Sequence, residues 1–136
     1  SLSLNHFRNY QRMRLEVGHV PLVFTGHNGS GKTNILEAIS LLIPGRGLRR
    51  AKLSELDNCH SKEAWSVAAN LHGMQGAVQI GTGRDPENNT ESDKRLVRVD
   101  GKSARSQADL SAHVAMLWLT PQMEQLFNQG SSENRK

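Results

Sequence analysis

The sequence has little of what marks several classes of protein. Among its 136 residues Cys59 is the single cysteine, so an internal disulfide framework and a cysteine-rich zinc site are both excluded. Aromatic residues make up only 4%, and no apolar run approaches the ~20 residues that a membrane-spanning helix needs. These absences argue against a disulfide-rich secreted protein and a membrane protein. We therefore expect a soluble, cytoplasmic protein that has no membrane partner.

Charge is present but unevenly placed along the chain. The formal net charge is +4, yet residues 1–52 hold eight Lys or Arg and only two Asp or Glu. A basic excess of this kind suits a polyanion such as a nucleotide or nucleic acid, and a solvated basic surface is the equally good alternative. The same alternatives apply to one cluster that could contact DNA or a partner: Arg46, Arg49, Arg50 and Lys52.

Hydrophobic periodicity predicts a mixed α/β fold in which one sheet packs against helices. Alternating residues and short apolar runs predict strands over residues 2–7, 13–17, 20–25, 66–72, 77–81, 96–99, 102–105 and 115–119. Apolar residues at helical spacing predict a helix over 34–43. Further helices are expected over 107–114 and over 122–127, the second because Thr120-Pro121 can begin a helix. Asp100-Gly101 is a strong signal for a tight hairpin turn. The polar stretch 84–94 is expected to be an exposed loop.

One motif carries recognisable chemistry. Residues 26–33 read Gly-His-Asn-Gly-Ser-Gly-Lys-Thr and fit G-x-x-x-x-G-K-[ST], the Walker A or P-loop pattern. Glycines let the backbone approach phosphates, and the following helix adds its positive end at the same place. Lys32 is expected to reach the β- and γ-phosphates of ATP, and the Thr33 hydroxyl to bind Mg²⁺. The residues expected to bind the nucleotide are Gly26, His27, Asn28, Gly29, Ser30, Gly31, Lys32 and Thr33.

A glycine-rich turn that binds nothing is the alternative interpretation of this motif. The expected buried strand before it and the expected helix after it argue against that alternative, because a P-loop joins a strand to a helix.

The residues around the motif resemble those of a known family. The matching segments are residues 2–10, 26–39, 45–49, 119–123 and 130–133. Together they are similar to the N-terminal part of the RecF family, within the SMC-like, ABC-type P-loop ATPases. His27 departs from the proline that many relatives have there, and Asn134 interrupts the basic run expected near the end. The likeness is weak between residues 57 and 115.

The resemblance implies a fold and a function. The fold would be lobe I of an ABC-type ATPase head, with ATP sandwiched in an ATP-dependent homodimer. The protein would bind gapped or single-stranded DNA and cooperate with a RecR-like partner. Its processes would be DNA replication, recombination and repair, including the SOS response.

The resemblance also suggests roles for two residues outside the P-loop. Arg8 matches a position near the nucleotide, and the alternative is a surface strand residue. Gln122 matches the Q-loop glutamine, which would act with Lys32 in catalysis and hold Mg²⁺ together with Thr33. The alternative for Gln122 is a solvent-facing residue in the first turn of a helix.

Two motifs of ATP hydrolysis are missing. No apolar run ending in Asp-Glu follows Thr33, so there is no Walker B element, and no Leu-Ser-x-Gly-type signature occurs. Because hydrolysis depends on positioned metal and water, we expect residues 1–136 to be an ATP-binding lobe that stops before Walker B and does not hydrolyse ATP alone. The alternatives are a nucleotide-binding or interaction module without hydrolysis, and a related SMC-type head.

Overall fold

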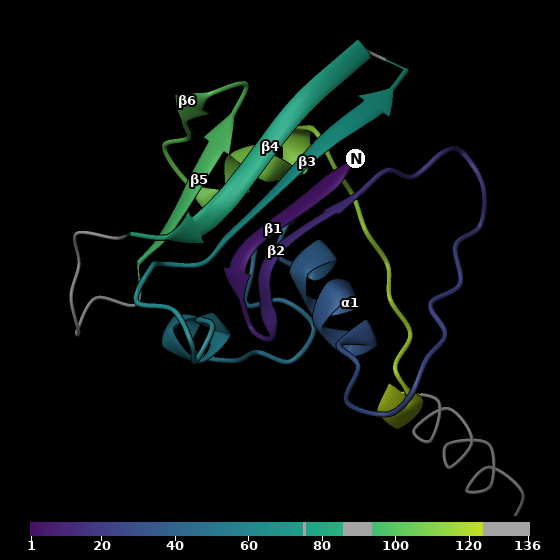
Figure 1. Cartoon of the computed structure of the whole chain (residues 1–136). Helices are drawn as coiled ribbons and strands as arrows, with labels where there is room; N and C mark the ends of the chain where they lie inside the picture. Colours follow the sequence, from purple (N-terminus) through teal and green to yellow (C-terminus); the bar gives the residue numbers. More distant parts are fainter. Residues whose placement is uncertain (75, 86–93, 124–136) are drawn as a thin grey trace, which may run out of the picture.

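The computed structural model describes residues 1–74, 76–85 and 94–123, in which an antiparallel sheet packs against one α-helix (Figure 1). The sheet order is β2-β1-β3-β4-β5-β6, and every neighbouring pair is antiparallel. The elements are β1 (Leu2–Phe7), β2 (Tyr10–Leu15), α1 (Lys32–Ser40), the 3₁₀-helix η1 (Leu53–Leu56), β3 (Ser66–Gly73), β4 (Gly76–Arg84), β5 (Arg95–Val99), β6 (Lys102–Ser103) and the 3₁₀-helix η2 (Gln107–Ala112).

A tight turn joins β5 to β6. The β5–β6 turn places Asp100 and Gly101 at φ 48° and 76°, the left-handed conformation that a two-residue hairpin turn requires. The Asp100 carboxylate also accepts a hydrogen bond from the backbone N–H of Gln79 at 2.8 Å. The hairpin turn predicted from Asp100-Gly101 is therefore confirmed, and it is tied to β4.

The core lies between one face of the sheet and α1. Leu4, Val67 and Ile80 come from three adjacent strands and are completely buried, and Ala38 of α1 is buried equally. Trp65 meets Phe7 edge to face, with ring centroids 5.7 Å apart, and its indole N–H donates to the Leu53 carbonyl at 2.9 Å. Buried aromatic rings prefer such geometry and a partner for their polar atom.

A buried arginine joins the end of α1 to the sheet. Arg95 on β5 donates to the carbonyl oxygens of Leu41, Ile43 and Gly45, and to the hydroxyl of Thr82 at 2.6 Å. Burial lowers the pKa of Arg95 to about 10, so the side chain stays charged at neutral pH. A cation beside the carbonyl end of a helix is favourable. The side chain thus satisfies backbone oxygens just past α1.

The segment before the P-loop differs from its prediction. The expected buried strand over 20–25 is wrong: these residues form no ladder, and Val20 and Val23 are 67% and 80% exposed. The chain leaves β2, makes a wide excursion and returns at α1 (Figure 1). An apolar run becomes a strand only beside another strand edge, and within the described ranges none pairs with this segment.

Other predictions near the end of the chain are corrected or fall outside the structure. The expected strand over 115–119 is wrong, because these residues form no ladder and Leu117 is fully exposed. The helix expected over 107–114 is the shorter η2. Residues 121–123 are helical, and the rest of the helix expected over 122–127 lies outside the described residues, as do 86–93 of the expected loop.

Candidate nucleotide-binding site

The P-loop runs from residue 26 into the first turn of α1. The loop has positive φ values at Gly26, Gly29 and Gly31, namely 147°, 83° and 97°. Residues that carry a Cβ rarely adopt such values. A Cβ at Gly31 would also lie 2.6 Å from both the Asn9 amide nitrogen and the Tyr10 hydroxyl, so a side chain there would displace these two groups. The β1–β2 turn therefore lies directly against the end of the loop.

Lys32 closes the loop on itself. Its ammonium group donates to the carbonyl oxygens of Gly26 and His27 at 2.6 and 2.7 Å, and to the Ser30 hydroxyl at 3.4 Å. All three acceptors are neutral, and within the described ranges Lys32 forms no ion pair with a carboxylate. The positive charge of Lys32 is therefore available to an anion.

The N-terminus of α1 adds to this positive site. Gly31 is its N-cap, no side chain caps the helix, and its first turn holds no acidic residue. The free N–H groups and the helix dipole attract negative charge, so the loop and the helix end form an anion site. Gly26, His27, Asn28, Gly29, Ser30 and Thr33 are exposed around Lys32, as a ligand site requires.

One groove brings together two predicted residues that are far apart in sequence. Thr33 at the start of α1 and Gln122 line the same groove, with apolar residues such as Leu36 and Trp118. Both Thr33 and Gln122 are exposed, so neither side chain is committed to the core. The structure thus places the two expected Mg²⁺ ligands on one surface next to the P-loop.

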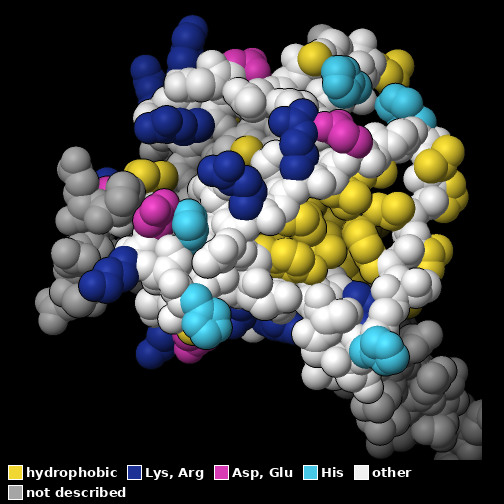
Figure 2. Space-filling view, viewed as in Figure 1, with side chains coloured by type: hydrophobic (Ala, Val, Ile, Leu, Met, Phe, Trp, Pro, Cys, Tyr) yellow, Lys and Arg dark blue, Asp and Glu magenta, His cyan; other side chains and the backbone are white. Residues whose placement is uncertain are grey.

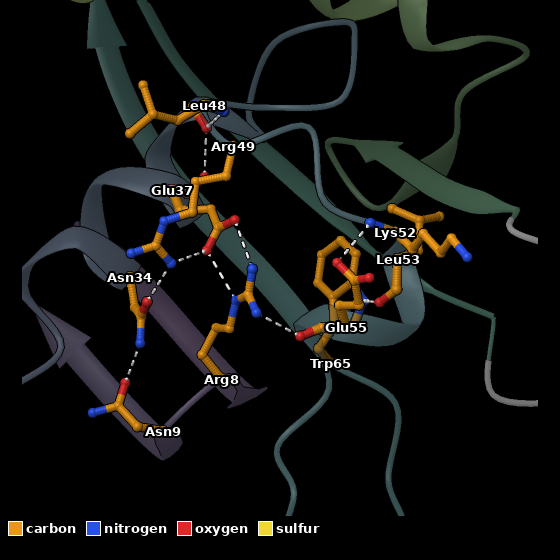
Figure 3. A network of polar contacts seen from close by, with 11 residues as sticks. Arg8, Asn9, Asn34, Glu37, Leu48, Arg49, Lys52, Leu53, Glu55 and Trp65 are labelled. Carbon is orange, nitrogen blue, oxygen red and sulfur yellow. Dashed lines mark hydrogen bonds and ion pairs between the residues drawn. The ribbon is translucent and has the colours of Figure 1, made fainter. Parts of the chain in front are cut away.

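The other predicted residue, Arg8, points into a network of polar contacts (Figure 3). Its Nε and Nη2 atoms donate to both carboxylate oxygens of Glu37 at 3.0 and 2.9 Å, and Nη1 donates to the Glu55 carbonyl at 2.8 Å. Each nitrogen of the Arg8 guanidinium therefore has a protein acceptor. Glu37 is only 2% exposed, so this bidentate pair is shielded from water on the carboxylate side.

The same network extends from Glu37 to the P-loop helix and the basic turn. Arg49 donates to Glu37 at 3.2 Å and to the Asn34 side-chain oxygen at 2.9 Å. The Asn34 amide in turn donates to Asn9 at 2.8 Å, which returns to the β1–β2 turn (Figure 3). Glu37 therefore links the β1–β2 turn, α1 and the turn that holds Arg49.

Sequence reasoning did not find the role of Glu37. The available signal was its isolation: Glu37 is the single acidic residue between 17 and 54, a stretch with five Lys or Arg. A lone acid beside the apolar stripe of a helix is a candidate for a buried ion pair.

The fold and the loop agree with the family to which the chain belongs. Residues 1–133 match the family described as "AAA domain", so the chain belongs to that family. No helix in the part of the chain that the structure describes is long and apolar enough to cross a membrane.

Within this class the relatives are RecF proteins, and the resemblance predicted from the sequence is confirmed. The chain is 46% identical to "DNA replication and repair protein RecF" of Allorhizobium ampelinum and 44% identical to that of Rhizobium rhizogenes. Each alignment covers 99% of this chain and 36% of the relative. The chain thus spans about a third of the length of these curated relatives.

Solved structures give the same result. The chain is similar to "Structure of the recombination mediator protein RecF-ATP in RecFOR pathway", with a TM-score of 0.77, 27% identity, and coverage of 89% of this chain and 32% of that one. A second structure, of RecF with "ATPrS", matches with a TM-score of 0.76. The expected ATPase-head fold is therefore confirmed.

Proposed function

We propose that this chain is the ATP-binding part of a RecF-like protein that acts in DNA replication, recombination and repair. The observation that carries the proposal is Lys32, an ammonium group without a carboxylate partner, held at the uncapped N-terminus of α1 by neutral carbonyls. ATP phosphates replace those carbonyls as acceptors, because charged acceptors bind an ammonium group more strongly. The names of the similar structures, which include ATP, support this ligand.

Mg²⁺ is the expected companion of the nucleotide. The groove shared by Thr33 and Gln122 supports these residues as ligands, because hydroxyl and amide oxygens suit a hard cation. Within the described ranges no group of three or more His, Cys, Asp or Glu side chains could hold a metal. The remaining ligands would then be phosphate oxygens and water, which is usual for Mg²⁺ at nucleotides.

The wider function rests on the relatives. Their names, "DNA replication and repair protein RecF" and "RecFOR pathway", support DNA and other recombination mediators as partners. The chain then works in an ATP-dependent homodimer that binds gapped or single-stranded DNA, with a RecR-like partner. Lys32 and Gln122 are the residues proposed for catalysis in that assembly.

A module that binds nucleotide without hydrolysing it is the second candidate. It is favoured by the lack of a Walker B run and of a signature sequence in these 136 residues. In a Mg²⁺-ATPase assay this chain by itself should show no turnover above its Lys32→Ala variant. Turnover clearly above that variant would contradict the module and show that the chain carries its own hydrolytic groups.

Calorimetric titration with Mg-ATP tests the proposed ligand. Lys32→Ala should weaken binding by about 10- to 100-fold, which is the usual worth of a hydrogen bond to a charged group. Lys52→Ala is the matched control, since it removes the same charge from an exposed position outside the loop and should change affinity less than twofold. Equal affinity in wild type and Lys32→Ala would overturn the proposal.

A further inference from the structure

Two asparagine side chains join the start of α1 to the sheet. The Asn34 side-chain nitrogen donates to the Asn9 side-chain oxygen at 2.8 Å. Asn34 is the third residue of α1, so it lies in the turn whose free N–H groups form part of the anion site. Asn9 lies in the turn between β1 and β2. The contact therefore ties the anion-binding end of the helix to the first two strands.

A second donor fixes the orientation of the Asn34 amide. Arg49 donates from Nη1 to the Asn34 side-chain oxygen at 2.9 Å (Figure 3). Because a guanidinium group has only donors, the atom that faces Arg49 is the oxygen, and the amide nitrogen is left to face Asn9. Both ends of this amide are therefore engaged, and a short side chain with a donor and an acceptor on separate atoms is what the position requires.

The Asn9 side chain also lies against the last residue of the loop. A Cβ built at Gly31 would lie 2.6 Å from the Asn9 side-chain nitrogen and 2.9 Å from its oxygen. Gly31 is the N-cap of α1 and has a φ of 97°. A shift of Asn9 would therefore change the space around the residue at which the loop becomes a helix.

On its other side the loop is held less closely. In the described ranges, the backbone hydrogen bonds of residues 26–31 stay within the loop and the first turn of α1. The segment before the loop packs on the core through Phe24, yet it leaves a hollow of about 460 Å³ beside α1, lined also by Val17 and Leu22. Figure 2 shows apolar side chains gathered between the sheet and this segment. The polar contact between Asn34 and Asn9 is thus a principal link from the loop to the sheet.

We propose that Asn34 is a positioning residue for phosphate binding. Through Asn9 it holds Gly31 and the N-terminus of α1 in the arrangement that accepts phosphates, and it does not touch the nucleotide itself. A site that is already ordered binds more tightly, because less freedom is lost when the ligand arrives. This inference rests on the proposed function for its ligand, and it adds that phosphate affinity depends on the β1–β2 turn.

Calorimetric titrations of this chain with Mg-ATP and with Mg-tripolyphosphate test the proposal. Asn34→Ala should weaken both ligands by the same factor, about fivefold, which corresponds to the loss of one hydrogen bond. Asn5→Ala is the matched control, because Asn5 on β1 donates to the Ser66 hydroxyl at 3.4 Å, outside the loop and α1. It should change either affinity less than twofold. Weaker ATP binding with unchanged tripolyphosphate binding would overturn the proposal, since Asn34 would then act on the nucleoside.

A double-mutant cycle separates positioning from direct contact. If Asn34 acts through Asn9, Asn9→Ala should also weaken both ligands about fivefold, and Asn9→Ala/Asn34→Ala should be no weaker than either single variant. Effects that multiply in the double variant would show that the two side chains act independently, and this result would contradict the positioning role.

A destabilised core variant shows whether affinity simply follows stability. Val67→Ser changes a completely buried side chain outside the loop, so the folded protein should bind ATP within twofold of wild type. Val97→Ala, a milder change at a buried site, replaces it if Val67→Ser does not fold. If the core variant weakens ATP as much as Asn34→Ala does, the role of Asn34 is only structural and the proposal fails.

The same titrations distinguish this inference from the proposed function. Equal binding of both ligands by wild type and Asn34→Ala would overturn the positioning role and leave the proposed function standing. If wild type binds neither ATP nor tripolyphosphate, the proposed function itself is overturned.

Discussion

The sheet-and-helix side of the molecule and the phosphate-loop arm, residues 16–31, keep their shapes by different means. On the sheet side, apolar side chains are completely buried, and two charged residues, Arg95 and Glu37, lie inside with full sets of partners. The arm forms no strand ladder, and Val20 and Val23 are exposed. Its loop is held mainly by the Lys32 ammonium group, which donates to the carbonyl oxygens of residues 26 and 27. Stability and ligand binding therefore belong to separate regions of the molecule.

The two regions meet at the base of the loop and at Phe24, which packs against the hydrophobic core. The side chains of Asn9 and Tyr10 pack against Gly31, and Asn34 and Glu37 extend the contact along α1. The scaffold therefore holds the base of the loop in place. We expect contacts with the ligand to hold the tip of the loop. Substitutions on either side of this boundary should have effects of very different size.

The largest expected effect is at Arg95. Arg95→Met keeps much of the side-chain volume but removes the donor from the buried carbonyl of Leu41 and from the partly buried carbonyls of Ile43 and Gly45. We expect the free energy of unfolding to fall by about 3–5 kcal/mol, as for the loss of a buried charged partner. Urea denaturation measures this change. Arg98→Met on the same strand is the control and should stay within about 0.5 kcal/mol, because its side chain is exposed.

A somewhat smaller loss is expected at Glu37. Glu37→Gln keeps the shape but removes the charge that Arg8 and Arg49 share, so two guanidinium groups lose their counter-charge. Unfolding should become easier by about 2–4 kcal/mol, since one partner of a buried pair has been removed. Glu16→Gln breaks an exposed pair and should cost less than about 1 kcal/mol. Equal losses in the two variants would show that burial of Glu37 contributes nothing.

The smallest effect is expected in the arm, and a matched pair of substitutions measures it. Val67→Ser places a hydroxyl at a completely buried site and should cost about 2–3 kcal/mol. Val23→Ser makes the same chemical change at a site that is 80% exposed and should stay within about 0.5 kcal/mol. Thermal unfolding of both variants of this chain provides the comparison. A large loss at Val23 would contradict the boundary drawn here.

Local patterns made much of the scaffold predictable. The alternation over 2–7 and 66–72 reports burial on one side of a sheet, and Asp100-Gly101 permits few turns besides the one observed. The P-loop was also predictable, because its eight residues are contiguous and their chemistry is local. These features need no information about distant partners.

Other features depend on partners that no local pattern names. An apolar run such as 20–25 predicts burial, but whether it becomes a strand depends on a neighbouring edge. Glu37 and Arg95 have the composition of exposed residues, and their burial follows from contacts 29 residues away to Arg8 and 54 away to Leu41. The shared Mg²⁺ role of Thr33 and Gln122 was predicted from the family resemblance and not from periodicity, and their common groove is visible only in the structure.

Hydrogen exchange with and without Mg-ATP shows whether nucleotide completes the phosphate-loop arm on a scaffold that is already stable without it. Our account predicts that ATP slows exchange of the backbone amides over residues 28–33 by at least tenfold, while amides in β3 and β4 change little. The slowing should vanish in Lys32→Ala. Unchanged exchange in the loop, or equal slowing across loop and sheet, would contradict the account.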